Sequence, residues 1–143
     1  MKTVRDVLKA KGGIVFTAEP DDTVYNALTI MAEQNIGALV VREAARVVGI
    51  FSERDYARKG ILRGHMSKET QVSEIMTSPV MYVTPEHTVD DCMNLMTERR
   101  IRHVPVVEDG RLCGIISIGD VVKSRIGELE KDRFELMEYI TAR

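Results

Sequence analysis

The chain has 143 residues and a formal net charge of −2, with 44% hydrophobic and 29% charged residues. That length suits one domain, or two very small ones packed together, and it excludes a large multidomain enzyme. The composition is that of an ordinary globular protein, and the nearly balanced charge argues against a dedicated surface for nucleic acid or an anionic membrane. We therefore expect neither partner, and any basic site must be local.

Cysteine content and hydropathy indicate the cellular compartment of the protein and argue against a membrane span. Cys92 and Cys113 do not make a disulfide framework, and no apolar run reaches the roughly 20 residues of a membrane helix. The lack of a disulfide framework makes the reducing cytoplasm the expected compartment. Charges begin at Lys2 and Arg5 with no apolar signal stretch after them, so we expect the N-terminus to be the start of the folded protein. The cysteines and histidines lack the short spacings of a zinc site, so we expect no metal.

The second half of the chain repeats the first. Residues 20–55 align with residues 85–120 at a constant offset of 65, and 13 of the 36 aligned positions are identical. Upstream, residues 4–8 resemble residues 72–76 at an offset of 68. Such self-similarity fixes the architecture before any local prediction is made.

The predicted elements recur in the same order in both repeats. In the first they are an apolar segment at 4–8, an extended piece at 14–17, a helix at 24–35, strands at 38–41 and 47–51, and a helix at 55–62. In the second they are segments at 72–76 and 80–84, a helix from 89, strands at 103–107 and 112–117, and a helix at 120–126. Apolar residues at helical spacing mark the long helices, and Thr88 with Asp91 resembles a capping box.

We therefore predict an α+β fold made of two β-α-β-β-α repeats. One repeat is too small to be comfortable alone, so the two, at 4–63 and 72–126, should share a core around a pseudo-twofold axis. Residues 64–71 form the linker. Residues 127–143 carry alternating charge and an apolar stripe, which predicts a C-terminal helix that packs on the body or on a second subunit. The alternative is a solvated terminal helix.

The segment at 49–55 and its counterpart at 114–120 contain the residues most suited to binding a ligand. Each runs from the end of a strand through a serine into the first turn of a helix, where unpaired N–H groups can receive phosphate or another polar ligand. The carboxylate three residues after the serine, Asp55 or Asp120, can accept hydrogen bonds from the vicinal hydroxyls of a ribose. The alternative is that each Ser-x-x-Asp is only a helix cap.

These features resemble a known family. The paired G-I-x-S-x-x-D motifs, their 65-residue spacing and the strand I-R-H-V-P-V-V resemble a tandem cystathionine-beta-synthase (CBS) domain pair, or Bateman module. The run F-S-E-R-D-Y-A-R-K followed by V-S-E-I-M-T is similar to the stand-alone CBS-pair proteins. The resemblance implies a regulatory module without catalysis that binds AMP, ADP, ATP or NAD in clefts between its repeats and forms a homodimer.

The resemblance also implies roles for individual residues. It implies that Ser52 with Asp55, and Ser117 with Asp120, hold the ribose. The candidates for the adenine-binding cleft wall are Thr17, Ile36, Gly37, Ala38, Thr84, Ile101, Val104 and Pro105.

The two copies differ in the charges that suit phosphate. Arg54 stands where the second copy has Gly119, and Arg102 with His103 stand where the first copy has Gly37 and Ala38. A guanidinium offers phosphate a fixed fork of donors, and a histidine adds a pH-sensitive contact. We therefore predict one strong and one weak site per chain. Arg54, Arg102 and His103 are the phosphate candidates, with Arg58 and Lys59 as weaker ones; the alternatives are surface ion pairs and an ordinary strand histidine.

Two other classes of function stay open at this point. An enzyme that processes nucleotides or uses NAD would need a general base beside a nucleophile, and the sequence presents no such pair and no Gly-x-x-x-x-Gly-Lys phosphate loop. An interaction module with a decayed site would have lost the ribose carboxylates, yet both aspartates remain. The sequence names neither the ligand nor a target protein, and guanine nucleotides and S-adenosylmethionine also fit a serine-aspartate clamp.

Overall fold

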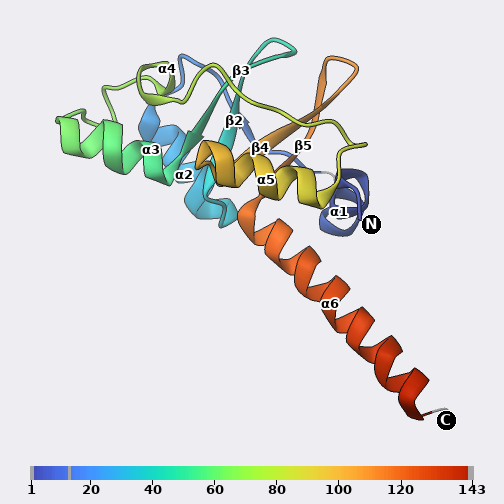
Figure 1. The fold of residues 1–143 in the computed structure, drawn as a ribbon. Coiled ribbons are helices and arrows are strands. Elements are labelled where there is room, and N and C mark those ends of the chain that lie inside the picture. Colours follow the sequence, from blue (N-terminus) through green and yellow to red (C-terminus); the bar gives the residue numbers. More distant parts are fainter. Residues whose placement is uncertain (1, 13, 142–143) are drawn as a thin grey trace.

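The computed structural model describes residues 2–12 and 14–141, and its elements follow the predicted repeat (Figure 1). The first half contains α1 (Val4–Lys11), β1 (Thr17–Ala18), α2 (Val24–Gln34), β2 (Ala38–Glu43), β3 (Arg46–Ser52) and α3 (Glu53–Asp55), which a π-helical turn (Tyr56–Gly60) and a 3-10 turn (Ile61–Arg63) extend. The second half contains α4 (Val72–Ile75), α5 (Val89–Arg99), β4 (His103–Glu108), β5 (Arg111–Ser117) and α6 (Ile118–Thr141).

A β-hairpin forms the sheet of each half. β2 pairs antiparallel with β3, and β1 adds in parallel beside β2. β4 pairs antiparallel with β5, while the extended piece expected at 80–84 contributes only a parallel bridge from Val83 to Val106. The register shifts between Val41 and Arg42 in one hairpin and between Val106 and Val107 in the other, which are equivalent positions of the repeat. The predicted α+β fold is confirmed.

The long helices begin and end where local chemistry dictates. The Thr23 hydroxyl caps α2, and α2 ends where Asn35 adopts the left-handed conformation. The capping box that the sequence predicts at the start of α5 is confirmed, because Thr88 and Asp91 bond each other's backbone N–H groups. These caps fix the direction in which each helix leaves its sheet.

The first short helix of each half packs into the core of the other half. Val4 of α1 is buried in a cluster with Val104 of the second half. Val72 and Ile75 of α4 are buried in a cluster with Phe51 of the first half. The sequence units 4–63 and 72–126 therefore do not coincide with the two hydrophobic cores, and each core needs residues from both units.

Two glycines allow this exchange of helices. A Cβ atom at Gly114 of β5 would collide with the Leu8 side chain of α1, and a Cβ atom at Gly49 of β3 would collide with Met76, just after α4. The two glycines occupy equivalent positions of the repeat, as do the two apolar side chains that cover them. Glycine is required here by close packing and not by an unusual backbone conformation.

The C-terminal helix differs from the expectation. We expected a helix near 120–126 and a separate one from residue 127, but α6 runs without a break from Ile118 to Thr141, and residues 142–143 lie outside the described residues. Gly127 does not end the helix because an interior glycine costs only about 1 kcal/mol relative to alanine. Beyond the body α6 projects away from it (Figure 1), so this segment does not pack on the body, and the other part of the expectation, packing on a second subunit, stays a prediction. None of the described helices is long and apolar enough to cross a membrane.

The contact between Gly114 and Leu8 gives a test of the exchange. We expect Gly114→Ala to lower the free energy of unfolding by about 1–3 kcal/mol, because the added methyl group overpacks the α1 contact. Leu8→Ala in the same chain should recover part of that loss by making room. Urea denaturation of the single and double variants measures both effects. Gly127→Ala, at an open helical position, is the matched control, and equal effects of the two glycine substitutions would contradict the exchanged packing.

Candidate functional site

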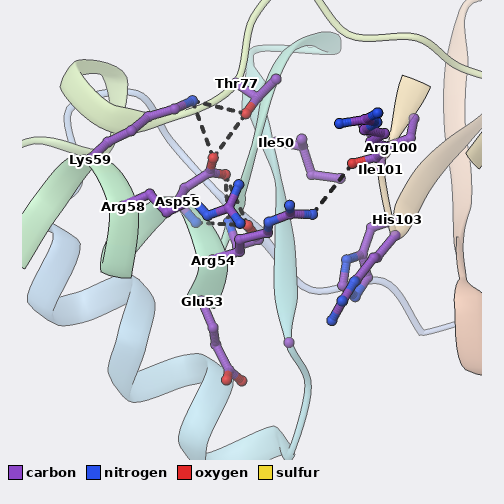
Figure 2. Close-up of a pocket in the computed structure, with 13 residues that line it drawn as sticks. Ile50, Glu53, Arg54, Asp55, Arg58, Lys59, Thr77, Arg100, Ile101 and His103 are labelled. Atoms are coloured by element: carbon purple, nitrogen blue, oxygen red, sulfur yellow. Dashed lines mark hydrogen bonds and ion pairs between the residues drawn. The ribbon is translucent and has the colours of Figure 1, made fainter. Parts of the chain in front are cut away.

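A cavity of about 550 Å³ lies where the two halves meet (Figure 2). That volume is within the usual range for small-molecule sites. Its walls come from the ends of β2 and β3, the start of α3, the segment after α4 and the approach to β4. The lining residues are Gly37, Ile50, Ser52, Glu53, Arg54, Asp55, Arg58, Lys59, Thr77, Arg100, Ile101, Arg102 and His103.

Ser52 and Asp55 form a reciprocal cap at the start of α3. The Ser52 hydroxyl accepts from the Asp55 N–H at 3.1 Å, and Asp55 Oδ2 accepts from the Ser52 N–H and hydroxyl at 3.0 Å each. Asp55 is only 8% exposed, and its Oδ1 accepts from the Thr77 hydroxyl at 2.9 Å and lies 3.2 Å from Lys59 Nζ. The capping alternative is therefore present in the structure, and both carboxylate oxygens already have donors.

The first turn of α3 offers less to a phosphate than its sequence suggests. The Glu53 N–H donates to the Gly37 carbonyl at 3.1 Å, and the Asp55 N–H donates to Ser52. These two donors bind protein oxygens, so an anion in this cavity has to be held mainly by side chains. The equivalent hydrogen bond is present in the second half, where the Ile118 N–H donates to the Arg102 carbonyl at 2.8 Å.

Guanidinium groups supply the positive charge that could hold an anion in this cavity. Arg54, Arg58, Arg100 and Arg102 all line the cavity, although the chain as a whole is slightly acidic. Figure 2 shows Arg54 reaching toward the other half, where its Nη1 donates to the Arg100 carbonyl at 3.4 Å. Within the described part of the chain, no carboxylate lies at ion-pair distance from any of these four arginines. The cavity therefore has an excess of positive charge, since the only acidic residues among the described residues of its lining are Glu53 and Asp55.

His103 stands at the start of β4 on the opposite wall of the cavity. Its Nε2 lies 3.6 Å from the point where a Cβ of Gly37 would be, so the missing side chain leaves the ring room. Burial lowers the pKa of His103 below its ordinary value, and the charge of Lys11 acts in the same direction against the opposing pull of Asp120. The ring is therefore neutral at pH 7 in the absence of an anion.

The cavity brings together part of the predicted site. Of the predicted ribose and phosphate residues it contains Ser52, Asp55, Arg54, Arg102 and His103, together with the weaker candidates Arg58 and Lys59. Of the predicted cleft wall it contains Gly37 and Ile101. The remaining predicted residues, which do not line it, are Thr17, Ile36, Ala38, Thr84, Val104, Pro105, Ser117 and Asp120.

Pairing and packing account for four of these eight residues. Ala38 and Val104 turn their side chains into buried surroundings, and Val104 belongs to the second-half core. Thr17 pairs with Val40 inside the first sheet. The Thr84 N–H donates to the His87 ring at 2.9 Å, which holds Thr84 in a turn before α5.

Four lining residues were not singled out by sequence reasoning. Ile50 and Glu53 lie inside the recognised motif, beside the residues chosen from it. Thr77 reaches Asp55 because its backbone forms an antiparallel bridge with Ile50, a long-range pairing that motif spacing does not reveal. Arg100 follows the last residue of α5 and adopts the left-handed conformation. The only sequence signal for Arg100 as a phosphate-binding candidate is its positive charge close to Arg102.

Ser117 and Asp120 repeat the cap but have another cation. Asp120 Oδ2 accepts from the Ser117 N–H at 2.8 Å, and the Asp120 N–H donates to Ser117 at 3.1 Å. Lys11 Nζ lies 2.7 Å from the same Oδ2 and donates to the Ile115 carbonyl at 2.7 Å. Burial alone would raise the pKa of Asp120, but the hydrogen bonds from Lys11 and Ser117 outweigh it and lower that pKa below its ordinary value.

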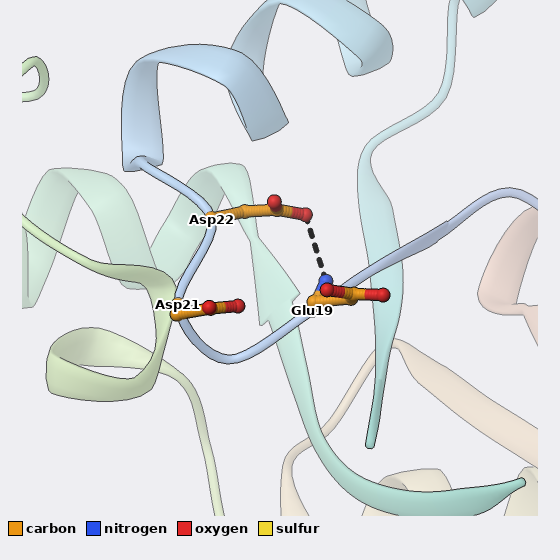
Figure 3. A group of neighbouring side chains, drawn as sticks. All are labelled: Glu19, Asp21 and Asp22. Carbon is orange, nitrogen blue, oxygen red and sulfur yellow. Dashed lines mark hydrogen bonds between the residues drawn. The ribbon is translucent and has the colours of Figure 1, made fainter. Parts of the chain in front are cut away.

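An acidic cluster, Glu19, Asp21 and Asp22, lies in the turn before α2 (Figure 3). Asp22 Oδ2 accepts from the Glu19 N–H at 2.8 Å, which closes the turn. Glu19 and Asp21 are exposed, so water solvates their carboxylates. This hydrogen bond gives Asp22 a structural role in stabilising the turn.

The fold and the cavity define a duplicated α+β module with a cationic cleft between its halves. A family model described as CBS domain matches residues 4–61 and again residues 72–127. The chain therefore belongs to the CBS domain family, as a tandem pair, and the resemblance found in the sequence is confirmed. Such a pair is a regulatory module.

Curated and solved relatives agree with this assignment. The chain is 44% identical to the mitochondrial CBS domain-containing protein CBSX3 of Arabidopsis thaliana, over 96% of this chain and 71% of the relative. A solved protein with CBS domains from Burkholderia ambifaria superposes with a TM-score of 0.85 at 50% identity, covering 88% of this chain and 95% of the other. A CBS domain pair solved with methylthioadenosine and S-adenosyl-L-methionine superposes with a TM-score of 0.78 at 28% identity, over 90% and 98% of the two chains.

The neutral His103 gives a prediction about acid stability. Because its folded pKa lies below the unfolded value near 6.5, the unfolded chain binds more protons in the interval between the two. The free energy of unfolding should therefore fall as the pH decreases through that interval, by at most about 1.4 kcal/mol per pH unit for one proton. Urea titrations between pH 7 and pH 5 measure the slope, and His103→Gln should reduce it.

His65→Gln is the matched control for this measurement, since His65 is exposed and outside the cavity, and it should keep the wild-type slope. The lowered carboxyl pKa of Asp120 changes the free energy of unfolding only at more acidic pH, so its contribution can be distinguished from that of His103. An unchanged slope in His103→Gln would contradict a buried neutral ring.

Proposed function

We propose that this protein is a regulatory sensor that binds an adenine nucleotide, of the AMP, ADP, ATP or NAD type, in the cleft at Ser52 and Asp55, and that it has no catalysis of its own. Binding acts through a change of conformation or association that a target protein reads. The observation that carries the proposal is the placement of a capped carboxylate beside four guanidiniums that have no carboxylate at ion-pair distance among the described residues.

The cleft offers complementary groups to each part of such a ligand. Asp55 accepts from vicinal ribose hydroxyls once these replace the Thr77 hydroxyl or the Lys59 ammonium on its Oδ1. Arg54 and Arg102 approach from opposite halves, so one phosphate group can accept hydrogen bonds from both. His103 becomes protonated as the anion arrives, which adds a third charged donor.

The adenine ring is expected against the apolar part of the wall. Ile50 and Ile101 face the cavity from the two halves, and Gly37 leaves space between them and His103. An aromatic base buried between aliphatic side chains gains from the removal of apolar surface from water. Selectivity for adenine over guanine then depends on backbone groups at this end of the cleft.

The relative solved with methylthioadenosine and S-adenosyl-L-methionine supports an adenosine ligand as a class. In this chain the cationic lining favours a ligand that carries negative charge. S-adenosylmethionine has a positively charged sulfonium, which four guanidiniums would repel. We therefore propose AMP first, with ADP, ATP and NAD as alternatives.

The arrangement of hydroxyls supports binding more than catalysis. Ser52 and Thr77 both donate to Asp55, whose carboxylate is held in turn by the α3 cap and by Lys59. Both hydroxyls are thus engaged as donors, and ligand hydroxyls that replace the Thr77 hydroxyl would use the Asp55 carboxylate as a clamp. Steady turnover of a bound nucleotide, abolished by Asp55→Ala, would instead favour the enzyme alternative.

The clamp is tested by calorimetric titration with AMP, ATP, NAD, GTP and S-adenosylmethionine. We expect Asp55→Ala to weaken binding of the adenine nucleotide at least tenfold, because the ribose loses its acceptor. Asp91→Ala is the matched control: Asp91 also closes a capping box, at the start of α5, but lies outside the cavity, so this variant should keep wild-type affinity.

The role of ligand charge is tested by adding adenosine, which carries no phosphate, to the same set of titrations. Arg54→Ala should weaken binding about tenfold or more for nucleotides and much less for adenosine, since a charge-assisted hydrogen bond contributes about 1.5–3 kcal/mol. If no nucleotide binds to the wild-type protein, the sensor proposal fails and an interaction module remains. Equal losses in Asp55→Ala and Asp91→Ala would show that only the helix cap matters.

We further propose that the protein acts as a homodimer in which the projecting part of α6 takes part. Leu129, Leu136 and Ile140 are each 59% exposed on this segment, and their spacing of seven and four residues places them on one helix face. A solitary helix is marginal in water, and helices in proteins gain most of their stability from packing an apolar face. A second copy of the same helix, related by a closed twofold axis, covers this face without leaving an open end.

The dimer proposal is tested by light scattering with size-exclusion chromatography. We expect the wild-type chain to run at twice its monomer mass and the variant Leu129→Glu/Leu136→Glu to run as a monomer, because the buried face acquires charges. The variant Glu130→Gln/Glu138→Gln, on the same segment, should remain dimeric. A monomeric wild type would contradict the proposal.

We propose a reducing compartment, such as the cytoplasm, as the place of action. Both thiols are free, and burial raises the pKa of Cys92 to about 11, so it is a core residue and not a reactive thiol. The name of the Arabidopsis relative places that protein in the mitochondrion.

A further inference from the structure

The two halves carry equivalent carboxylates that are not equivalently neutralised. Asp55 and Asp120 are 65 residues apart, and each closes a capping box with the serine three residues before it. In the first half the cation is Lys59, four residues further along the same helical segment. The place of Lys59 is taken in the second half by Ser124, which is buried and whose hydroxyl has no hydrogen-bond partner among the described residues.

Lys11 takes over the missing charge from another element. It is the last residue of α1, 109 positions away from Asp120 in the sequence, and its Nζ donates to both Asp120 Oδ2 and the Ile115 carbonyl. A cation in the last turn is also favoured by the helix dipole of α1. The Asp120 carboxylate, the Ile115 carbonyl and the dipole of α1 therefore all stabilise this ammonium, although the Lys11 side chain is 36% exposed.

The segment after α4 fills the corresponding place in the first half. There the Ile50 carbonyl accepts from the Thr77 N–H at 2.8 Å, and the Thr77 hydroxyl reaches Asp55. The exchanged segment thus brings a neutral hydroxyl to Asp55, which already has Lys59 from its own half, and an ammonium to Asp120, which has serine at the position equivalent to Lys59. Lys59 lines the open cavity, where a ligand can contact it, whereas Lys11 ties a strand carbonyl to the carboxylate.

We propose that Lys11 is the residue that restricts nucleotide binding to one site per chain, by occupying the Asp120 carboxylate in place of ligand hydroxyls. This inference rests on the proposed function of the Ser52–Asp55 cleft. A ribose at Asp120 has to displace an ion pair at 2.7 Å, and the second motif lacks the guanidinium of Arg54 because Gly119 stands at that position. Lys11 is thus a specificity-determining residue that makes two duplicated motifs unequal.

The test is the binding stoichiometry, measured by calorimetric titration with AMP and ATP as probes. We expect one nucleotide per wild-type chain and a second, weaker equivalent in Lys11→Met, which keeps the aliphatic stem and removes the charge. Lys9→Met, at an exposed position of the same helix, is the matched control and should bind one. Adding Asp120→Asn to Lys11→Met should return the stoichiometry to one.

Each outcome of the titration has a distinct meaning. Two equivalents in the wild type, or one in Lys11→Met, would overturn the role of Lys11 and leave the Ser52–Asp55 site intact. Loss of all binding in Lys11→Met would also overturn it, because Lys11 would then serve the occupied site. No binding to any of the chains would overturn the proposed function itself.

A second measurement tests the ion pair without any ligand. In a double-mutant cycle of Lys11→Met and Asp120→Asn, we expect the two substitutions to be coupled by a factor of about three to ten in the unfolding equilibrium constant. Lys9→Met with Asp120→Asn should show no coupling. Additive effects of Lys11→Met and Asp120→Asn would show that the ammonium does not hold the carboxylate in solution, and the proposal would fail.

Discussion

The exchange of the first helices between the two hydrophobic cores is the constraint on which the rest of the structure depends. α1 closes the core of the second half through Leu8 on Gly114, and α4 closes the core of the first half through Met76 on Gly49. Neither half keeps its own first helix, so neither can bury its sheet alone. The two units must fold together, and the cleft between them follows from that requirement.

The same exchange determines the chemistry of the cleft. The residues directly after each exchanged helix, or at its end, arrive beside the carboxylate of the other unit: Thr77 beside Asp55, and Lys11 beside Asp120. Packing of an apolar helix thus delivers a polar side chain to a motif far away in the sequence. Because the delivered side chains differ, a duplicated fold acquires two sites with different charge, and identical caps need not have identical functions.

Much of this architecture could be predicted from the sequence, because duplication makes local signals appear twice. The hairpins, the capping box at Thr88 and the clustering of Arg54 with Arg102 all follow from patterns within a few residues or from the repeat offset. The exchange could not be predicted, since apolar segments at 4–8 and 72–76 fit either core equally well. Thr77 and Lys11 were missed for the same reason, because long-range packing brings them to the aspartates.

In the proposed sensor, occupation of the cleft would have mechanical consequences because Asp55 already has donors. A ribose that binds Asp55 replaces the Thr77 hydroxyl or Lys59, and Thr77 is joined through its backbone to Ile50 and follows α4 directly. Loss of that contact weakens the link between α4 and the first-half sheet. A ligand can shift a conformational equilibrium only by binding one arrangement better than another, and here the two arrangements differ in which donor Asp55 accepts from. In the proposed sensor, the carboxylate is therefore both the anchor for the ligand and the point at which binding is transmitted to the exchanged helix.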